Sequence, residues 1–232
     1  MGRAKGSRNK DFEDARRTIA GSVLRHASGH PGDAPSFREL ARIAEVTPNT
    51  LRHYFPSRDA VFVAALASAH EEGAVHLERA SGAGVAIPAL EASIREYLEY
   101  FAAGFRHGVG HLIAFGLGAG LGNDVVGPAF LNSVLEPTLA ALECRLDLHA
   151  KRGELVPCDV RLAALSLLSP LLVGLLHQQP LGGARCRPLA IATVVDEQVT
   201  RFLAAYGRAP RTVRKRPAPR AARGAKGKVV AR

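Results

Sequence analysis

Side chains able to bind a nucleic acid gather in one short stretch of this chain, residues 47–58 (TPNTLRHYFPSR). Their hydroxyl, amide and imidazole groups can hydrogen-bond to base edges, and their arginine and tyrosine side chains can bind phosphate. Elsewhere the sequence offers no nucleophile paired with a base, no paired-carboxylate motif, no phosphate loop and no metal-ligand spacing. The chain is therefore expected to bind rather than to catalyse, without enzyme activity, cofactor or metal.

Two short helices must position these side chains. The first begins at a capping box, in which Ser36 accepts from the amide of Glu39 and Glu39 reaches back to Ser36. The second begins with Thr47 as its N-cap and Pro48 at its first helical position. A tight turn at Glu45 separates them. Two helices joined by a short turn, with polar side chains on the second, form the helix-turn-helix arrangement that reads a DNA major groove.

This motif resembles the DNA-binding domain of the TetR family of bacterial transcription regulators, which ends in a pattern close to T-L-Y-x-H/Y-F-x-S-K/R-x-A-L. Residues 50–61 read TLRHYFPSRDAV, and the similarity runs from about residue 11 to residue 66. Glu45 stands where the family usually has glycine, so the turn must form without the residue that best tolerates positive φ. Arg52 stands where the family often has tyrosine, which puts the operator sequence in question more than DNA binding. The alternative interpretation is a helical hairpin whose polar face is only solvated.

The outward face of the motif supplies the predicted DNA contacts. The second helix is expected to contact bases or nearby phosphates, and Tyr54 and Arg58 are expected to hold phosphate. The start of the preceding helix adds secondary phosphate candidates. The full predicted set is Ser36, Arg38, Thr47, Pro48, Asn49, Thr50, Arg52, His53, Tyr54, Ser57 and Arg58.

The composition indicates a core built mainly from aliphatic side chains, because 47% of the 232 residues are hydrophobic but only 6% are aromatic. The three cysteines are too few and too unevenly spaced for a disulfide framework, which suits a reducing cytoplasm. The N-terminus lacks the apolar run of a signal peptide. The longest apolar stretch, residues 162–176, is shorter than the roughly 20 residues of a membrane span. We therefore expect a cytoplasmic protein that does not enter a membrane.

Positive charge is concentrated at the ends of the chain. Residues 208–232 contain ten Lys and Arg residues and no acid, and so account for the whole net charge of +10. This tail and the short basic arm at residues 1–10 have the composition of disordered segments. Each could attract DNA without regard to sequence, or could simply be solvated. A non-specific or architectural DNA-binding protein driven by its basic tails is therefore the alternative to a sequence-specific regulator.

No segment shows sustained two-residue alternation, and apolar residues recur at helical spacing, so we predict an all-α fold of about nine helices. The resemblance implies the same plan, with three helices in the head and six in the body. Helices are expected at about 11–27, 36–44, 47–55, 57–79, 88–107, 128–152, 160–177 and 188–206, with an irregular glycine-rich helix over 108–123. The predicted organisation is a basic disordered arm (1–10), a helix-turn-helix head (11–66), a body for effector binding and dimerisation (67–207) and a basic disordered tail (208–232).

The apolar stretch at residues 162–176 predicts a homodimer. A helix that is hydrophobic on nearly every side must be buried on every side, and little of a small body remains to cover it. Pairing it and the last helix with the same two helices of a second copy gives an isologous four-helix interface. A core helix within a monomer is the alternative. The predicted interface residues are Leu165, Leu168, Leu172, Leu176, Val195, Val199 and Phe202.

The resemblance also implies a small effector, expected to be mostly apolar, bound in the body. Each candidate lining residue can equally be ordinary core, because any buried helix face shows such an aromatic stripe. His107 and His111 are four residues apart, but no acidic or cysteine ligand lies on the same turn to complete a metal site. We predict a regulator, most simply a repressor, that leaves a pseudo-palindromic operator in double-stranded DNA when its effector binds. The effector candidates are Tyr97, Tyr100, Phe101, Phe105, His111, Phe115 and Phe130.

Overall fold

The computed structural model describes residues 5–29 and 35–208. Across these residues the regular elements are all helical, and an isolated antiparallel bridge joins Leu155 to Gly207. The predicted all-α fold is therefore confirmed. The predictions about residues 1–4 of the arm and residues 209–232 of the tail lie outside the described residues.

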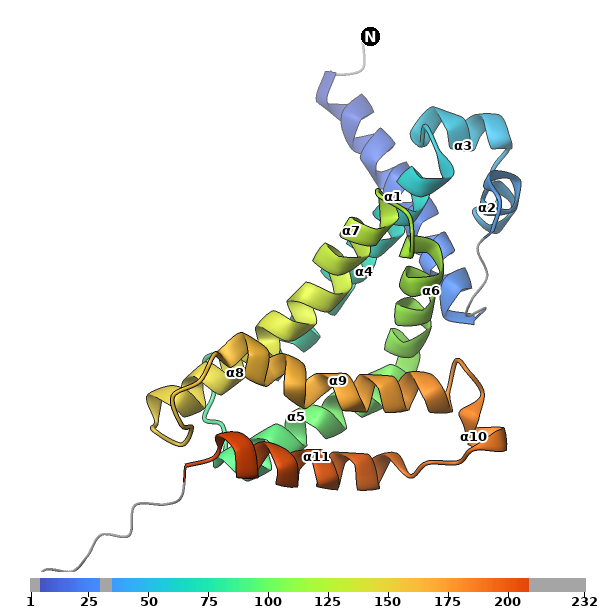
Figure 1. Cartoon of the computed structure of the whole chain (residues 1–232). Helices are drawn as coiled ribbons and strands as arrows, with labels where there is room; N and C mark the ends of the chain where they lie inside the picture. Colours follow the sequence, from blue (N-terminus) through green and yellow to red (C-terminus); the bar gives the residue numbers. More distant parts are fainter. Residues whose placement is uncertain (1–4, 30–34, 209–232) are drawn as a thin grey trace, which may run out of the picture.

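The N-terminal helices form the upper part of the molecule in Figure 1. Helix α1 packs against each of the three helices that follow it. Phe55, Leu40 and Leu51 are fully buried at the centre of this head. The elements are α1 (Lys5–Gly29), α2 (Phe37–Ile43), α3 (Pro48–Tyr54) and α4 (Arg58–Ser81).

Helix α1 begins at Lys5 rather than at Asp11, so residues 5–10, predicted to be disordered, are helical. Apolar periodicity, which starts at Phe12, marks only the part of a helix that packs on other elements, whereas backbone hydrogen bonding can continue beyond it. Asp14 lies within the helix, where it accepts a hydrogen bond from Arg17 over 3.2 Å.

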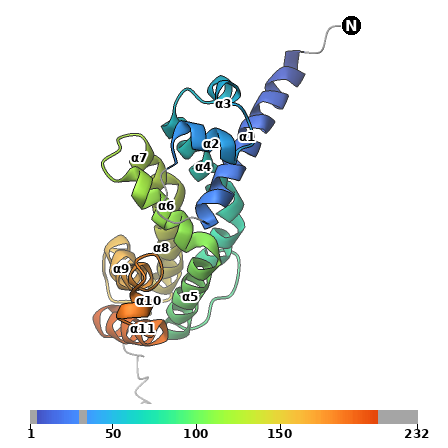
Figure 2. The same cartoon turned by 90° about the vertical axis from the view of Figure 1, so that its right-hand side faces the viewer.

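The remaining helices form the body, in which α9 and α11 lie side by side at the end away from the head (Figures 1 and 2). Helix α4 packs on α8, so it joins head and body. When the continuous run from α7 to α8 is counted as one helix, the described residues contain nine longer helices and the short α10, and about nine helices were predicted. The elements are α5 (Leu90–Gly104), η1 (Phe105–Val109), α6 (Gly110–Gly120), α7 (Val126–Phe130), η2 (Leu131–Leu135), α8 (Glu136–Lys151), α9 (Val160–Gln178), α10 (Gly183–Cys186) and α11 (Ile191–Tyr206).

Two π-helical segments interrupt the body helices. Within η1, Gly108 has φ 120° and separates α5 from α6, so the irregularity expected over 108–123 is concentrated at its beginning. Segment η2 precedes Pro137. Because this proline has no amide hydrogen and its ring crowds the carbonyl four residues earlier, the helix widens there into a π turn. Helices α5 and α11 begin at Leu90 and Ile191, slightly later than predicted.

A buried arginine joins α8 to α5 and to the end of α4. Arg145 on α8 is 4% exposed. Its guanidinium donates to the Ser93 hydroxyl (2.8 Å), the Ala80 carbonyl (2.9 Å) and the Glu96 carboxylate (2.8 Å). Burying a charge is costly unless it is paired and hydrogen-bonded, and here every nitrogen of the side chain has a partner. These bonds fix the last turn of α4 to α5 and α8.

Helix α9 is long and apolar enough to cross a membrane, the only such helix in the described part of the chain. A core helix passes the same test, so this is weak evidence for a membrane span. One side of α9 packs on α8 and α11, where Leu167, Leu171 and Leu175 are fully buried. The other side carries Leu162 and Val173, which are 60% and 64% exposed. One chain therefore covers only part of this apolar helix.

Candidate nucleic-acid interface

Helix α3 begins at the predicted cap. The Thr47 hydroxyl oxygen accepts from the Thr50 amide over 3.0 Å, and the two hydroxyl oxygens lie 2.8 Å apart. Pro48 occupies the first helical position, where its missing amide hydrogen costs nothing. Leu51 and Phe55 are fully buried beneath the helix. This anchoring holds α3 with its polar side chains outward.

Helix α2 and the turn after it also form as predicted. The Ser36 amide donates to Glu39 Oε2 (2.7 Å), and the Glu39 amide donates to Ser36 Oγ (3.4 Å). The bonds from the Ser36 backbone and hydroxyl lower the pKa of Glu39. In the turn, Glu45 has φ 54° and is the one non-glycine residue with positive φ in the described part of the chain. The Val46 amide closes the turn by donating to the Ala41 carbonyl over 2.9 Å.

The predicted DNA contacts lie at the start of α2, along α3 and at the start of α4. Tyr54 and Arg58 are half-buried. The structure thus leaves most of the set accessible to a partner. The exposed members are Ser36, Arg38, Thr47, Pro48, Asn49, Thr50, Arg52, His53 and Ser57.

Aromatic rings from other helices support the side chains of α3. The Phe12 ring of α1 lies 5.6 Å from the His53 ring and 5.0 Å from the Tyr54 ring. The Arg52 guanidinium carbon lies 5.5 Å from the centre of the Phe37 ring of α2. These supporting roles could not be predicted from the sequence, in which Phe12 and Phe37 are only members of apolar stripes.

The predicted effector residues contact several different helices of the chain. Tyr97 is buried, and its hydroxyl donates to the Thr138 carbonyl on α8 over 2.9 Å. Burial raises the pKa of the Tyr97 hydroxyl. Tyr100 instead meets α4, where its hydroxyl lies 2.8 Å from Nδ1 of His76. These two candidates therefore serve contacts between helices.

The other effector candidates also pack against neighbouring side chains. The Phe115 ring packs edge-on against Phe62 of α4, with ring centres 5.0 Å apart. The rings of Phe101 and Phe105 lie next to each other, with ring centres 6.3 Å apart. Phe130 is buried, and His111 is half-buried. The arrangement is that of packed core, and the effector site stays a prediction.

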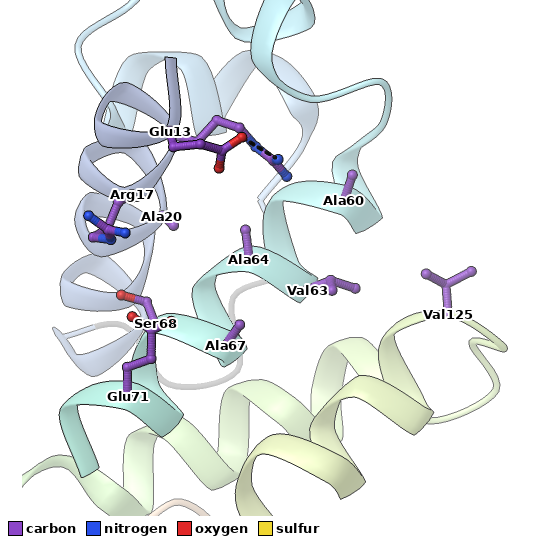
Figure 3. Close-up of a pocket in the computed structure, with 11 residues that line it drawn as sticks. Glu13, Arg17, Ala20, Ala60, Val63, Ala64, Ala67, Ser68, Glu71 and Val125 are labelled. Atoms are coloured by element: carbon purple, nitrogen blue, oxygen red, sulfur yellow. Dashed lines mark ion pairs between the residues drawn. The ribbon is translucent and has the colours of Figure 1, made fainter. Parts of the chain in front are cut away.

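An open cleft of about 490 Å³ lies between α1 and α4 (Figure 3). Four alanines line it, Ala20 from α1 and Ala60, Ala64 and Ala67 from α4, together with charged side chains of both helices. None of the seven effector candidates lines this cleft. The lining residues are Glu13, Arg16, Arg17, Ala20, Ala60, Val63, Ala64, Ala67, Ser68, Glu71 and Val125.

The predicted dimer residues divide into two groups. Val195, Val199 and Phe202 on α11 and Leu168 on α9 are at most 5% exposed within one chain and already belong to its core, so their place in a dimer interface stays a prediction. The two helices pack on each other and on the neighbouring α5 and α8, which already cover these positions. The second group, Leu165, Leu172 and Leu176, is half-buried.

No group of three or more His, Cys, Asp or Glu side chains within the described residues is placed to hold a metal ion. Cys144 and Cys158 are half-buried free thiols, and Cys186 is an exposed one.

Residues 95–208 match a family model for a TetR C-terminal domain, described as that of AefR-like transcriptional repressors. This match covers most of the body and none of the head. No curated protein sequence matches the chain significantly.

Solved structures extend the similarity over the whole fold. A protein assigned to the TetR-family regulators of Mesorhizobium loti MAFF303099 matches with a TM-score of 0.66 and 19% identity, over 84% of this chain and 98% of that one. The flavonoid-responsive regulator FrrA matches with a TM-score of 0.56 and 24% identity, over 86% and 99%. The regulator FadR of Bacillus subtilis, in complex with stearoyl-CoA, matches with a TM-score of 0.61 and 12% identity, over 81% and 97%.

Proposed function

The chain belongs to the TetR family of transcriptional regulators, and from this premise we propose that it is a cytoplasmic repressor. Its homodimer binds a pseudo-palindromic operator and leaves it when a small, mostly apolar effector binds the body. The observation that carries the proposal is the anchoring of α3. Leu51 and Phe55 are fully buried beneath this helix, while Asn49, Arg52 and His53 on it are exposed.

The proposed dimer forms through the outer face of α9. Leu162 and Val173 are large apolar side chains exposed on this face, and half-buried Leu165, Leu172 and Leu176 lie on the same helix. An uncovered apolar surface of this kind is characteristic of an interface. A two-fold axis through such a patch pairs it with itself, and an axis that runs along the head-to-body direction places the two α3 helices on one side of the dimer. Heads about 34–36 Å apart would meet successive major grooves.

An effector in the body can reach the head through a short chain of contacts. Phe115 of α6 packs on Phe62 of α4. At the tip of the α6–α7 hairpin (residues 110–130), Asn123 donates to Asp59 in the first turn of α4. A ligand that binds one arrangement of these helices more tightly shifts the equilibrium by its difference in affinity. The stearoyl-CoA bound to the FadR structure supports an apolar ligand class for this fold.

The basic tail offers the competing explanation for DNA binding. The chain leaves α11 at Gly207 and Arg208, where the Arg208 amide donates to the Glu154 carbonyl over 2.8 Å. This point lies at the opposite end of the molecule from α3 (Figure 1). A protein held to DNA by the tail alone would bind any duplex, with an affinity that falls steeply as salt rises.

Selection of bound sequences from a random DNA pool at near-physiological salt separates the two functions. The full chain is compared with a chain ending at Arg208, which keeps the bond to Glu154. Recovery of the same palindromic motif by both proteins supports the regulator. Recovery of no motif, together with loss of binding on truncation, overturns the regulator and favours the tail-driven protein.

A further inference from the structure

The polar side chains of α3 differ in the contacts that they make with the rest of the chain. Thr50 shares a hydrogen bond with Thr47. His53 packs against Phe12, and Arg52 lies over Phe37. Asn49 is exposed, and its side-chain amide forms no hydrogen bond with another described residue. Of these four side chains, Asn49 is therefore the one without a hydrogen bond or ring contact to another described residue.

The position of the Arg52 guanidinium is set by the other helix of the motif. Phe37 is the first residue of α2 and is half-buried, so its ring is a fixed platform. An arginine that stacks on an aromatic face keeps its N–H edge free for hydrogen bonds. In a helix-turn-helix, the first helix crosses the DNA backbone while the second enters the major groove. Stacking on Phe37 thus holds the charge beside the backbone-crossing helix, next to exposed Arg38 in the sequence.

We propose that Arg52 is a phosphate clamp positioned by Phe37, and that Asn49 reads an adenine in each half of the operator. Phosphate contacts fix the register of a protein on DNA, whereas contacts to base edges specify sequence. A side-chain amide has one acceptor and one donor group, which match N6 and N7 of adenine in the major groove. The inference rests on the proposed regulator function and deepens it, because it assigns separate roles to two side chains of one helix.

The test measures sequence selection and salt dependence for four variants of the full chain. Arg52→Gln is expected to select the wild-type motif but to bind all sequences more weakly. The slope of log affinity against log salt should fall by about one for each Arg52 removed. Asn49→Ala is expected to leave that slope unchanged and to lose the preference for adenine at one position of each half-site, by roughly 5- to 150-fold.

The role of Phe37 is tested by a double-mutant cycle. Phe37→Leu removes the aromatic face but keeps an apolar side chain, and its thermal unfolding serves as the folding control. It should weaken operator binding when Arg52 is present and have little further effect in the Arg52→Gln background, since residues in contact are not additive.

Three outcomes overturn parts of this account separately. A changed motif for Arg52→Gln would make Arg52 a base reader and overturn the clamp, while the regulator function would stand. Equal effects of Phe37→Leu with and without Arg52 would overturn the positioning role. Failure of the wild-type chain to select any motif would instead overturn the proposed function itself.

Discussion

The side-chain amide of Asn123 donates a hydrogen bond to Oδ2 of Asp59 over 3.1 Å. This bond joins the tip of the α6–α7 hairpin to the first turn of α4, directly after the helix-turn-helix motif. The carbonyl oxygen of the same Asn123 side chain accepts from the amides of Val125 (2.9 Å) and Val126 (2.8 Å). One residue thus caps α7 and ties the body to the head.

Breaking this tie should loosen the head from the body. Asp59→Ala removes the acceptor and leaves the cap of α7 intact, whereas Asp59→Asn loses the charge but keeps an acceptor oxygen. We expect Asp59→Ala to lower the free energy of unfolding by about 1–2 kcal/mol more than Asp59→Asn. Urea denaturation and hydrogen exchange at residues 58–62 and 121–127 measure the effect. Equal losses for both variants would assign it to the charge of Asp59 alone.

Close packing of α6 on Phe130 depends on a glycine. A Cβ atom added at Gly116 would lie 2.1 Å from Cδ2 of Phe130, whereas one added at Gly118 would meet nothing within 4 Å. We expect Gly116→Ala to destabilise the fold by about 1–3 kcal/mol through overpacking. Gly118→Ala, on the same helix, should stabilise it by up to about 1 kcal/mol. Thermal and urea unfolding of the pair tests this, and similar effects at both positions would contradict it.

The turn between α2 and α3 is strained at Glu45, where φ is 54°. A non-glycine residue in this conformation costs roughly 1–2 kcal/mol, partly offset by the greater backbone entropy that glycine loses on folding. Glu45→Gly should therefore raise the free energy of unfolding by roughly 0.5–1 kcal/mol. Glu45→Ala, which removes the charge but keeps the strain, should not. An equal gain in both variants would point to the charge rather than to φ.

Acid should weaken the fold through His149. This side chain is fully buried, its Nδ1 lies 2.7 Å from Oε2 of Glu154, and its Nε2 has no hydrogen-bond partner among the described residues. Burial lowers the pKa of His149, an effect that Glu154 opposes. The folded state then binds fewer protons than the unfolded state as pH falls below about 6.5, the ordinary histidine value.

The contribution of His149 to stability is thus complete above this pH and declines progressively below it, towards the lowered folded pKa. Urea unfolding of the wild type and of His149→Gln at pH 8 and pH 5.5 isolates the effect. The wild type should lose more stability than the variant on acidification. Parallel losses in the two proteins would show that other groups cause them.

The exposed face of α9 should hold the dimer together. Val173 on α9 and Val75 on α4 are almost equally exposed, at 64% and 65%. Val173→Asp should shift the protein towards monomer at micromolar concentration, because a carboxylate would be buried without a partner in the interface. Val75→Asp is the matched control and should remain dimeric. Sedimentation velocity distinguishes them, and a dimer that survives Val173→Asp would place the interface elsewhere.

The helix-turn-helix motif could be predicted from the sequence because its determinants are local. The caps at Ser36 and Thr47 act over three residues, and each forms as expected. The resemblance to the TetR family, which usually has glycine at this position, indicated the positive φ of Glu45. Helical periodicity likewise predicted the all-α class. It missed residues 5–10 of α1, which precede the apolar stripe of that helix.

Only the tertiary structure decided which faces of these helices meet. Val195, Val199 and Phe202 belong to the core of one chain, because α5 and α9 already cover them. The support of His53 by Phe12, the stacking of Arg52 on Phe37 and the bond from Asn123 to Asp59 join residues on different helices. An amphipathic pattern gives the direction of an apolar face within its own helix, but not the element that packs on it, since that choice depends on how all the helices are arranged together.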